Sequence, residues 1–545
     1  MRDVLVIGSG HNALIAACYL AADGWDVEVI ERDTVVGGAV STTQRWPGFH
    51  VDRGSSLHVM IRFTGIIEEL ALAECGLTYL DVDPWAFAPF WQGPPGKSEQ
   101  VALTFHTDLG RTCASIEAVC GARDADAYEA FARDWAGRNE RIFAYFQQPP
   151  SPGNAMRHFL GIGRAAGSRD GAELGRQFML PADALLDEHF TDERLKTALA
   201  WLGAQSGPPT HEPITADLMA WVALLHTRSP GRPVGGSGAL TAALLTRLQR
   251  SGGTIRLGDG AAGIVRRSGR VVGIITESGD EVRARRVIAG CHISETLRLL
   301  ADPHWLARGR AIRLGNGIGI AVRLATTGLP EYPSAPPPRT RRLGTQPIPV
   351  SDAHVGMQLL VPDRSFLRAA YADYLAGRIP QDPAVLAMSF SAIDPSLAPA
   401  GHHTLTLWAQ WHPYRLRSGQ WPAQTEAAGA AVIDVLDRAA PGFREKVTDV
   451  HVQTPDRLES ELGLRHGNVM HVEMTPESSF WWRPLPELSG YATPVPGLFL
   501  TGASTHPGGG VFGASGRSCA RVVGRSLRRA RPPRPVRGAA APGSR

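Results

Sequence analysis

Val4-Leu5-Val6-Ile7-Gly8-Ser9-Gly10-His11-Asn12-Ala13 decides the fold, because it joins a buried strand to a helix through a glycine-rich turn. Val4–Ile7 is a short apolar run, typical of a strand covered on both faces in a parallel sheet. Residues 12–22 hold alanines and leucines that predict a helix ending near Gly24, and Val27–Ile30 predicts a second strand. The stretch therefore predicts a βαβ unit of about 30 residues.

The turn between strand and helix has the pattern G-x-G-x-x-A, formed by Gly8, Gly10 and Ala13. The first glycine permits the tight turn, the second lets a pyrophosphate approach the backbone, and alanine allows the helix to pack closely on the strand. The helix N-terminus offers free N–H groups to phosphates. Glu31 ends the second strand, where its carboxylate is placed to accept hydrogen bonds from ribose hydroxyls. Together these features predict a dinucleotide site.

The glycine doublet Gly37-Gly38 indicates which dinucleotide binds. A doublet at this place lets a loop pass close to a second stretch of pyrophosphate and lead toward a flavin ring. In nicotinamide dehydrogenases a helix usually begins here instead. The sequence therefore favours FAD over NAD.

Segments at both ends of the chain carry a family resemblance. Residues 4–42, which include Glu31-Arg32 and Gly37-Gly38-Ala39-Val40, are matched at the other end by Leu498–Val511 and Gly513-Ala514-Ser515-Gly516. Shorter matching segments are 47–52, 233–240, 394–401, 466–468 and 483–484. All resemble the phytoene desaturase and carotenoid isomerase flavoprotein family, and most of all its branch containing pyridine nucleotide-disulphide oxidoreductase domain-containing protein 2.

The resemblance implies an α/β fold: a discontinuous FAD-binding Rossmann-type domain (a GR2-like flavoprotein) with an inserted α+β substrate domain. Alternating stretches between about 310 and 480 also predict an antiparallel sheet in that inserted domain. Residues 60–230 are predicted to be helical and irregular. We expect the FAD-binding domain at 1–60, 231–300 and 485–525, the substrate domain at 61–230 and 301–484, and a disordered tail rich in arginine and proline at 526–545.

The family also implies where FAD would lie. Its pyrophosphate would lie at the glycine turn, its adenine near Ala261 and its ribityl chain near Gly502–Ser504, while Gly509–Val511 would present helix-terminal N–H groups to the flavin pyrimidine. The residues expected to contact FAD are Gly8, Gly10, His11, Asn12, Ala13, Glu31, Arg32, Gly37, Gly38, Ala39, Ala261, Gly290, Gly502, Ala503, Ser504, Gly509, Gly510 and Val511.

The sequence identifies catalytic residues less clearly than it identifies the cofactor site. His58 and His506 are the weak candidates for acid–base chemistry, and we favour a structural role for both. Met470–Met474 alternates like a strand, so His471 and Glu473 would share a face and either line the substrate pocket or form an ordinary buried pair. Trp481 is a further pocket candidate, although an aromatic cluster of this kind is more often core.

Two features separate the chain from related amine oxidases. Those enzymes carry R-x-G-G-R around the doublet, where this chain has Val35 and Ala39. They also generally place a lysine beside the flavin on a strand of the substrate domain. The lysines of this chain are Lys97, Lys196 and Lys446, and we expect none of them at such a position.

The expected reaction is therefore dehydrogenation or desaturation of an apolar or polyene-like small molecule, in secondary metabolism, with O2 or a quinone as electron acceptor. Three alternatives stay open: a flavin-dependent cis-trans isomerase, an amine oxidase, and a non-catalytic interaction protein stabilised by flavin. Product mass separates the isomerase, release of ammonia and peroxide separates the oxidase, and a closed pocket beside the flavin would mark the interaction protein.

Composition sets the remaining bounds. A chain of 545 residues with 43% apolar and 20% charged residues is expected to form more than one structural unit of a soluble protein. A net charge of +4 gives no reason to expect a nucleic-acid partner, and the six cysteines lack metal-ligand spacing. We expect a cytoplasmic protein; the arginine-rich tail leaves weak peripheral membrane contact open, and the oligomeric state is undetermined.

Overall fold

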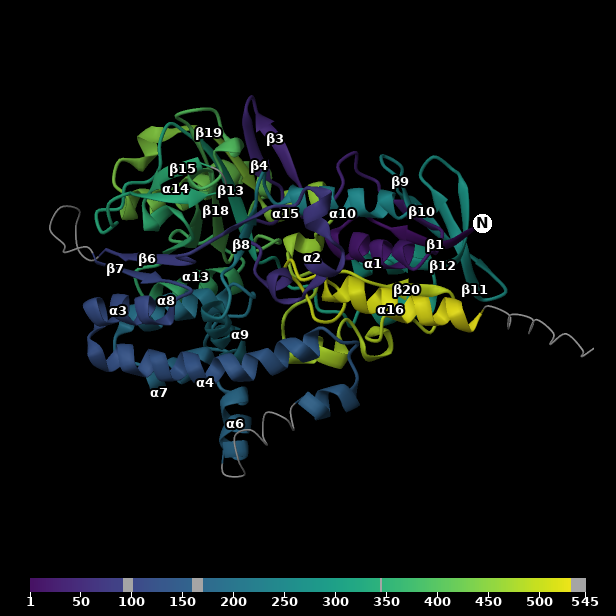
Figure 1. Cartoon of the computed structure of the whole chain (residues 1–545), viewed down its shortest axis with the longest axis horizontal. Coiled ribbons are helices and arrows are strands. Elements are labelled where there is room, and N and C mark those ends of the chain that lie inside the picture. Colours follow the sequence, from purple (N-terminus) through teal and green to yellow (C-terminus); the bar gives the residue numbers. More distant parts are fainter. Residues whose placement is uncertain (92–100, 159–169, 344–345, 531–545) are drawn as a thin grey trace, which may run out of the picture.

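The computed structural model describes residues 1–91, 101–158, 170–343 and 346–530 (Figure 1). The predicted βαβ unit stands at the centre of a largely parallel sheet assembled from three distant parts of the chain. In spatial order its strands are β10 (Ala261–Arg267), β11 (Arg270–Thr276), β12 (Glu281–Ala289), β1 (Arg2–Ile7), β2 (Val27–Ile30) and β9 (Thr254–Arg256), with β20 (Leu498–Leu500) beside β12. The pairs among β20, β12, β1, β2 and β9 are parallel, and the β10–β11–β12 meander is antiparallel.

Helices cover this first sheet closely. The helix α1 (His11–Ala22) follows β1 directly and packs against α16 (Ala514–Arg529) and α10 (Gly238–Arg250). Gly516 makes this approach possible, because a Cβ there would lie 3.0 Å from Ile15 Cβ and collide with the Asn12 carbonyl. The C-terminal helix is thereby fixed against the helix that begins at the glycine turn.

The second sheet is mixed and belongs to the inserted part of the chain. In spatial order its strands are β19 (Val447–Gln453), β13 (Gly319–Thr326), β18 (His403–Gln410), β17 (Ala384–Met388), β16 (Met357–Leu360), β6 (Ala86–Phe90) and β7 (Val101–Phe105). Only the β16–β6 pair is parallel. The predicted antiparallel sheet between 310 and 480 is confirmed, but β6 and β7 come from the stretch expected to be helical and irregular. The apolar run Ala86–Phe90 is buried throughout like a strand covered on both faces, but Pro89 argues against a strand in the sequence, because proline cannot donate a hydrogen bond to a neighbouring strand.

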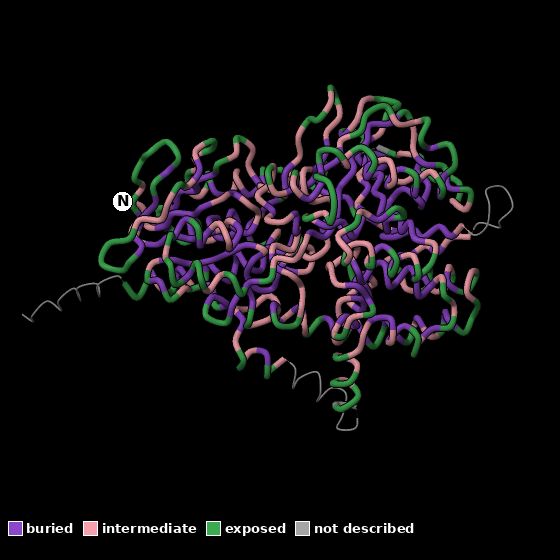
Figure 2. The backbone as a smooth tube through the Cα atoms, turned by 180° about the vertical axis from the view of Figure 1, so that it is seen from behind, coloured by how far each residue is buried: buried purple, intermediate pink, exposed green. Residues whose placement is uncertain are grey.

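Helices cover both faces of this second sheet (Figure 1). On one face lie α3 (Leu109–Cys120), α4 (Ala122–Phe146), α7 (Ala182–His189), α8 (Glu193–Ala204), α9 (Ala216–Ala220) and α13 (Arg364–Leu375). On the other lies α14 (Trp421–Ala439). Further α-helices are α2 (Ile66–Glu69), α6 (Asp170–Met179), α11 (Ile293–Leu300), α12 (Pro303–Gly309) and α15 (Pro455–Leu462). Two-stranded ribbons are formed by β3 (Thr42–Trp46) with β4 (Phe49–Asp52), β5 (Tyr79–Asp81) with β8 (Gly231–Pro233), and β14 (Arg339–Leu343) with β15 (Gln346–Val350). Figure 2 shows buried backbone running through both sheets.

Packing modifies the predicted domain limits. Ile61, Ile66 and Leu72 belong to the hydrophobic cluster of α1 and the first sheet, and Trp305 and Ile312 pack with its other face. We therefore propose that the nucleotide-binding unit extends past residues 60 and 300. The expected disordered tail is wrong at its start, because residues 526–529 belong to α16 and Leu527 is fully buried against the first core. Residues 531–545 lie outside the described residues. No helix within the described ranges is long and apolar enough to cross a membrane.

Candidate functional site

A cavity of about 1000 Å³ is lined by residues from both sheets. Its rim on the first sheet is the end of β1 with the glycine turn, joined by the doublet loop and by the segment after β20. All residues expected to contact FAD line this cavity except Ser504. The Ser504 hydroxyl instead accepts the Ile293 N–H at 3.0 Å and bonds His471 Nδ1 at 3.0 Å, which turns it away from the cavity.

The cavity has open space beside the glycine turn. A Cβ added to Gly10 would meet no atom within 4 Å, although the residue lies between β1 and α1 and lines the cavity. Gly38 crosses directly over it, since a Cβ there would lie 3.7 Å from Gly10 Cα. By contrast, a Cβ on Gly290 would lie 2.6 Å from Ala13 Cβ, so that glycine allows α1 to pack against the end of β12. The open space at Gly10 fits a pyrophosphate.

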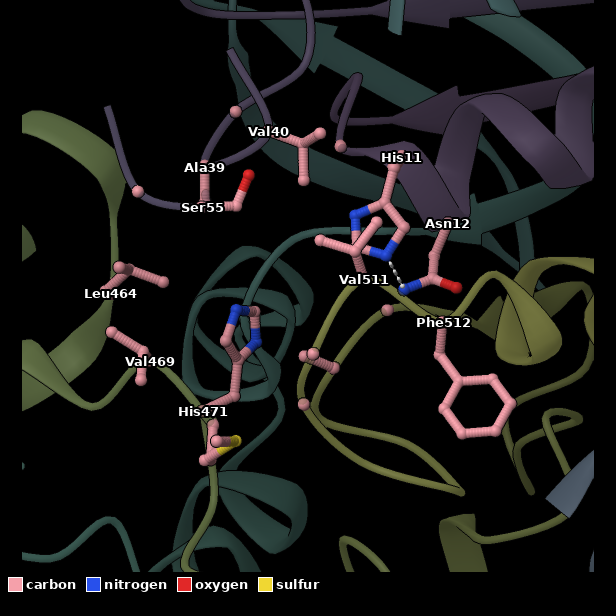
Figure 3. A pocket seen from close by; sticks show the side chains of 18 of the residues that line it. His11, Asn12, Ala39, Val40, Ser55, Leu464, Val469, His471, Val511 and Phe512 are labelled. Carbon is pink, nitrogen blue, oxygen red and sulfur yellow. Dashed lines mark hydrogen bonds between the residues drawn. The ribbon is translucent and has the colours of Figure 1, made fainter. Parts of the chain in front are cut away.

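The first turn of α1 supplies the groups that a phosphate needs. Its N-terminus has no capping side chain and no acidic residue, so its first N–H groups are free to bind an anion. His11 Nε2 and Asn12 Nδ2 are 3.0 Å apart, and Asn12 Oδ1 accepts the Gly516 N–H at 3.3 Å. Burial lowers the pKa of His11 to about 4, so its ring is neutral. Figure 3 shows the His11 and His471 rings directed into the same part of the pocket.

Glu31 is held in place by the turn itself. Its Oε2 accepts the Ser9 N–H at 2.7 Å and the Ser9 hydroxyl at 2.8 Å, and its Oε1 accepts the Asp33 N–H at 2.9 Å. The Ser9 hydroxyl also accepts the Gly37 N–H at 3.1 Å, which ties the doublet to the turn. Ser9 is fully buried beneath the cavity wall, and the motif does not mark it because it occupies a variable position of G-x-G-x-x-A. One lone pair of Oε1 remains for a ligand hydroxyl.

The C-terminal glycine segment reaches the cavity as a loop. The helix α16 begins at Ala514, so Gly509–Val511 precede it and do not occupy the helix-terminal position that we expected. Gly509 packs tightly on Met470, since a Cβ there would lie 2.9 Å from Met470 Cα. The Ser515 hydroxyl accepts the Gly502 N–H at 3.0 Å and so links the loop to the first turn of α16. Gly510 has a positive φ of +90°, and so has Gly513 (+81°), the residue directly before the helix, so glycine permits the turns between this loop and α16.

Neither weak catalytic candidate lines the cavity. His58 is fully buried and bonds the Tyr79 hydroxyl at 2.7 Å and the Ser237 hydroxyl at 2.5 Å, so it joins the ribbon of β5 and β8 to α10. His506 is fully buried among aromatic rings, the nearest being Tyr145 at 5.1 Å between centroids. Burial lowers the pKa of His58 well below its usual value and that of His506 to about 3. Both histidines are therefore buried, neutral and outside the cavity lining, in keeping with the structural role expected for them.

The substrate-pocket candidates separate in the structure. Residues 470–474 contain a turn and bends but no strand, and His471 adopts a positive φ of +66°, which a strand does not contain. His471 lines the cavity and stacks on His292, with ring centroids 4.9 Å apart. Glu473 does not line it, and its Oε2 lies 3.3 Å from Arg313 Nε instead. Trp481 does not line the cavity either, whereas its neighbour Phe480 does.

Beyond the glycine rim, the cavity wall is mostly apolar and aromatic. These side chains come from α4, α8, α9, the 3-10 helix that follows α9 (Trp221–His226) and the second sheet: Ile142, Phe143, Phe146, Leu202, Leu218, Trp221, Met357, Leu386, Met388 and Trp408. Phe143 stacks on Phe512 of the C-terminal loop with centroids 5.5 Å apart, which joins the wall to the rim. No motif marks these positions in the sequence.

Ionisable side chains also line the cavity, among them Asp456, Glu459 and Arg465, and two of them, Asp217 and Arg323, stand among the apolar residues of this wall. Asp217 on α9 lines the cavity, and its Oδ2 is buried without a hydrogen-bond partner in the described part of the chain. Burial raises the pKa of its carboxyl to about 7. Arg323 on β13 lines the cavity from the second sheet. Lys196 and Lys446 do not line the cavity and form ion pairs with Asp187 and Glu331, and Lys97 is outside the described residues.

Comparisons with known proteins agree with this geometry. Residues 14–524 match the family described as flavin containing amine oxidoreductase. The chain is 31% identical over 560 residues to pyridine nucleotide-disulfide oxidoreductase domain-containing protein 2 of Rattus norvegicus, with 96% of this chain and 94% of that protein covered. It is 25% identical over 524 residues to the neurosporene-forming phytoene desaturase of Cereibacter sphaeroides, with 94% and 92% covered.

Solved structures share the fold. An oxidoreductase from Methanosarcina mazei superposes with a TM-score of 0.60 at 16% identity, covering 96% of this chain and 100% of that one. Putrescine oxidase bound to putrescine superposes with a TM-score of 0.59 at 14% identity, covering 97% and 99%. The family resemblance expected from the sequence is confirmed, as is the α/β flavoprotein fold.

Proposed function

We propose, from the premise that this chain belongs to the flavin containing amine oxidoreductase family, that it dehydrogenates a small molecule of largely apolar structure. The chain is an FAD-dependent oxidoreductase, and FAD supplies the hydride-accepting chemistry when bound. The residues that would hold it are those of the glycine rim, with the first turn of α1 at the pyrophosphate and Glu31 at the adenosine ribose. The uncapped helix, the open space at Gly10 and the free lone pair of Glu31 all suit this group.

The observation that carries the proposed reaction is the apolar wall that continues from the glycine rim. Phe143, Trp221, Met388 and Trp408 stand on that wall, and Val511 and Phe512 join it to the C-terminal loop. A wall of this composition favours an apolar molecule and excludes water from the reacting atoms. The protein's own contribution to the reaction is then to orient the substrate and keep the site dry.

Amine oxidation is the second candidate, and one observation favours it. Asp217 places a carboxylate with an unpartnered oxygen in the cavity, where a substrate ammonium would compensate its burial. The composition of the cavity lining argues against amine oxidation, because no lysine occurs in it among the described residues. We therefore rank amine oxidation below dehydrogenation of an apolar substrate.

The test is reduction of the bound cofactor under anaerobic conditions. Polyenes, unconjugated long-chain compounds and amines are each mixed with the FAD-loaded protein, and loss of the visible absorption of oxidised flavin is followed. The proposal expects bleaching by an apolar compound and a product lighter than the substrate by a hydrogen pair. A product of unchanged mass would indicate isomerisation, and bleaching by amines alone, with ammonia released, would overturn the proposal. Reoxidation by O2 or by a quinone then identifies the acceptor.

A further inference from the structure

A buried arginine stands on the cavity wall of the second sheet. Arg323 lies in the middle of β13, whose residues are all buried, and the residue is 3% exposed. It lines the cavity together with Thr406, which faces it on β18. Charged residues are almost never fully buried unless they are paired, so this position needs an explanation.

The guanidinium has too few partners for its charge. Its Nη1 donates to Thr406 Oγ1 at 2.8 Å, and its Nη2 donates to the Arg53 carbonyl and to Gln453 Oε1, both at 3.4 Å. Its Nε has no hydrogen-bond partner, and no carboxylate forms an ion pair with it, in the ranges that the structure describes. Three of the five N–H donors of this group are used by these bonds, and Nε is itself buried, so the second N–H of Nη1 is the donor left for a ligand in the cavity.

The surrounding charges leave a positive surplus. Arg232 and Arg45 oppose the charge of Arg323, whereas Asp52 and Glu461 favour it. Asp52 is already ion-paired with Arg232. Burial lowers the pKa of Arg323 to about 10, which leaves the group charged near neutral pH. A buried cation without a counter-ion is costly, and an anion of the ligand would remove that cost.

The neighbours of Arg323 on the same wall are apolar. Met388 pairs with Thr406 across the sheet, and Trp408 pairs with Ala321 and Leu386 in the adjacent row. All of these side chains line the cavity. The wall therefore offers a cationic group beside an apolar surface. A charged donor binds a carboxylate more strongly than it binds a neutral hydroxyl.

We propose that the substrate of this enzyme is an apolar acid, whose carboxylate binds Arg323 while its hydrocarbon body lies along Met388, Leu386 and Trp408. This inference rests on the proposed function, because it names the class of molecule that the apolar cavity takes. It makes Arg323 the residue that selects the substrate. The phosphates of FAD are the other anion that the same guanidinium is able to bind, and the test separates the two.

Binding of three probes of equal chain length tests the proposal without turnover. Decanoate, decan-1-ol and decylamine are titrated into the FAD-loaded full chain, and binding is followed by tryptophan fluorescence, since Trp221 and Trp408 line the cavity, and by the flavin spectrum. We expect decanoate to bind at least about tenfold more tightly than decan-1-ol, because a charge-assisted hydrogen bond replaces a neutral one. Decylamine is expected to bind most weakly.

Variants assign the preference to this side chain. Arg323→Gln should bind decanoate no more tightly than decan-1-ol while keeping the affinity for decan-1-ol, and Arg323→Lys should keep part of the preference. Arg438→Gln is the matched control, because that arginine is exposed on α14 and paired with Asp382. It should change none of the three affinities. If Arg323→Gln does not fold, Arg323→Lys and the order of the three probes on the native chain decide.

Three results would overturn the proposal. One is an unchanged decanoate preference in Arg323→Gln. Another is loss of FAD affinity in that variant with the acid preference intact, which would assign the guanidinium to the cofactor phosphates. The third is tightest binding of decylamine, abolished in Asp217→Asn. If decanoate binds through Arg323 but no apolar compound reduces the flavin, the proposed function fails and the binding site stands.

Discussion

Replacing Gly10 by alanine separates cofactor binding from folding. The residue has φ −57° and ψ 153°, which alanine adopts without strain, and the added Cβ would meet no protein atom within 4 Å. The apoprotein should therefore keep or gain stability, by about 0.4–1 kcal/mol, because alanine restricts the unfolded chain. The same methyl group would occupy the space that we assign to the pyrophosphate.

The cost to FAD binding follows from the overlap. Forcing a methyl group into a filled, close-packed site costs about 1–3 kcal/mol, which corresponds to a roughly five- to 150-fold weaker FAD complex. Gly290→Ala should behave in the opposite way, since its Cβ would lie 2.6 Å from Ala13 Cβ and 3.0 Å from the Ile7 carbonyl oxygen. That variant should destabilise the apoprotein itself by about 1–3 kcal/mol.

The assay pairs thermal unfolding of the apoprotein with fluorescence titration by FAD. Gly490→Ala is the matched control, because its Cβ also meets no atom within 4 Å and the residue does not line the cavity. It should leave both quantities nearly unchanged. Native-like FAD affinity in Gly10→Ala would refute the placement of the pyrophosphate, and so would a loss of affinity that merely follows a loss of apoprotein stability.

Three further predictions concern side chains around the site. Glu31→Ala should weaken FAD binding by about ten- to 100-fold, measured in the same titration, because it removes a charged acceptor at the ribose and frees the Ser9 donors; an unchanged affinity would contradict this role. Burial raises the pKa of Asp217 from its ordinary 3.8 to about 7, and Arg138 opposes the shift. Between about pH 4 and pH 7 the unfolded chain therefore binds fewer protons at this group than the folded chain, so the contribution of Asp217 to stability falls as the pH rises. The unfolding of Asp217→Asn, measured against pH, should lack that decline, and a profile identical to that of the native chain would show that the group is not desolvated. His58→Ala should lower apoprotein stability by about 1–3 kcal/mol, because the Tyr79 and Ser237 hydroxyls each lose a hydrogen bond, and it should leave the rate of flavin reduction unaffected; a slowed reduction in a stable variant would return His58 to the list of catalytic candidates.

The cofactor side of the molecule was predictable because its chemistry acts on the backbone. A strand, a turn without side chains and a helix leave a fixed spacing of Gly8, Gly10 and Ala13, and that spacing is readable in one dimension. The doublet Gly37-Gly38 is equally local. Where the expectation depended on the start of a helix, as for Gly509–Val511, the error was a few residues.

The residues that line the substrate part of the cavity were predicted poorly, because they are distant in the sequence and come together only in the folded chain. His471 and Glu473 were expected on one face of a strand, but a single positive φ at His471 turns the chain and sends Glu473 to Arg313. Asp217 lies in a short helix that no motif marks. Arg323 did leave a signal, since a lone arginine inside the apolar run Gly319–Ala325 has to be buried if that run is a central strand.

The identity of the chromophore tests the central claim most directly. The chain is purified, mildly denatured, and the released small molecule is identified by its mass and absorption spectrum against the amount of protein. The account predicts FAD, in a ratio near one per chain, and a marked fall of that ratio in Gly10→Ala but not in Gly490→Ala. Release of FMN, of a nicotinamide dinucleotide, or of no chromophore even after incubation with FAD would contradict it.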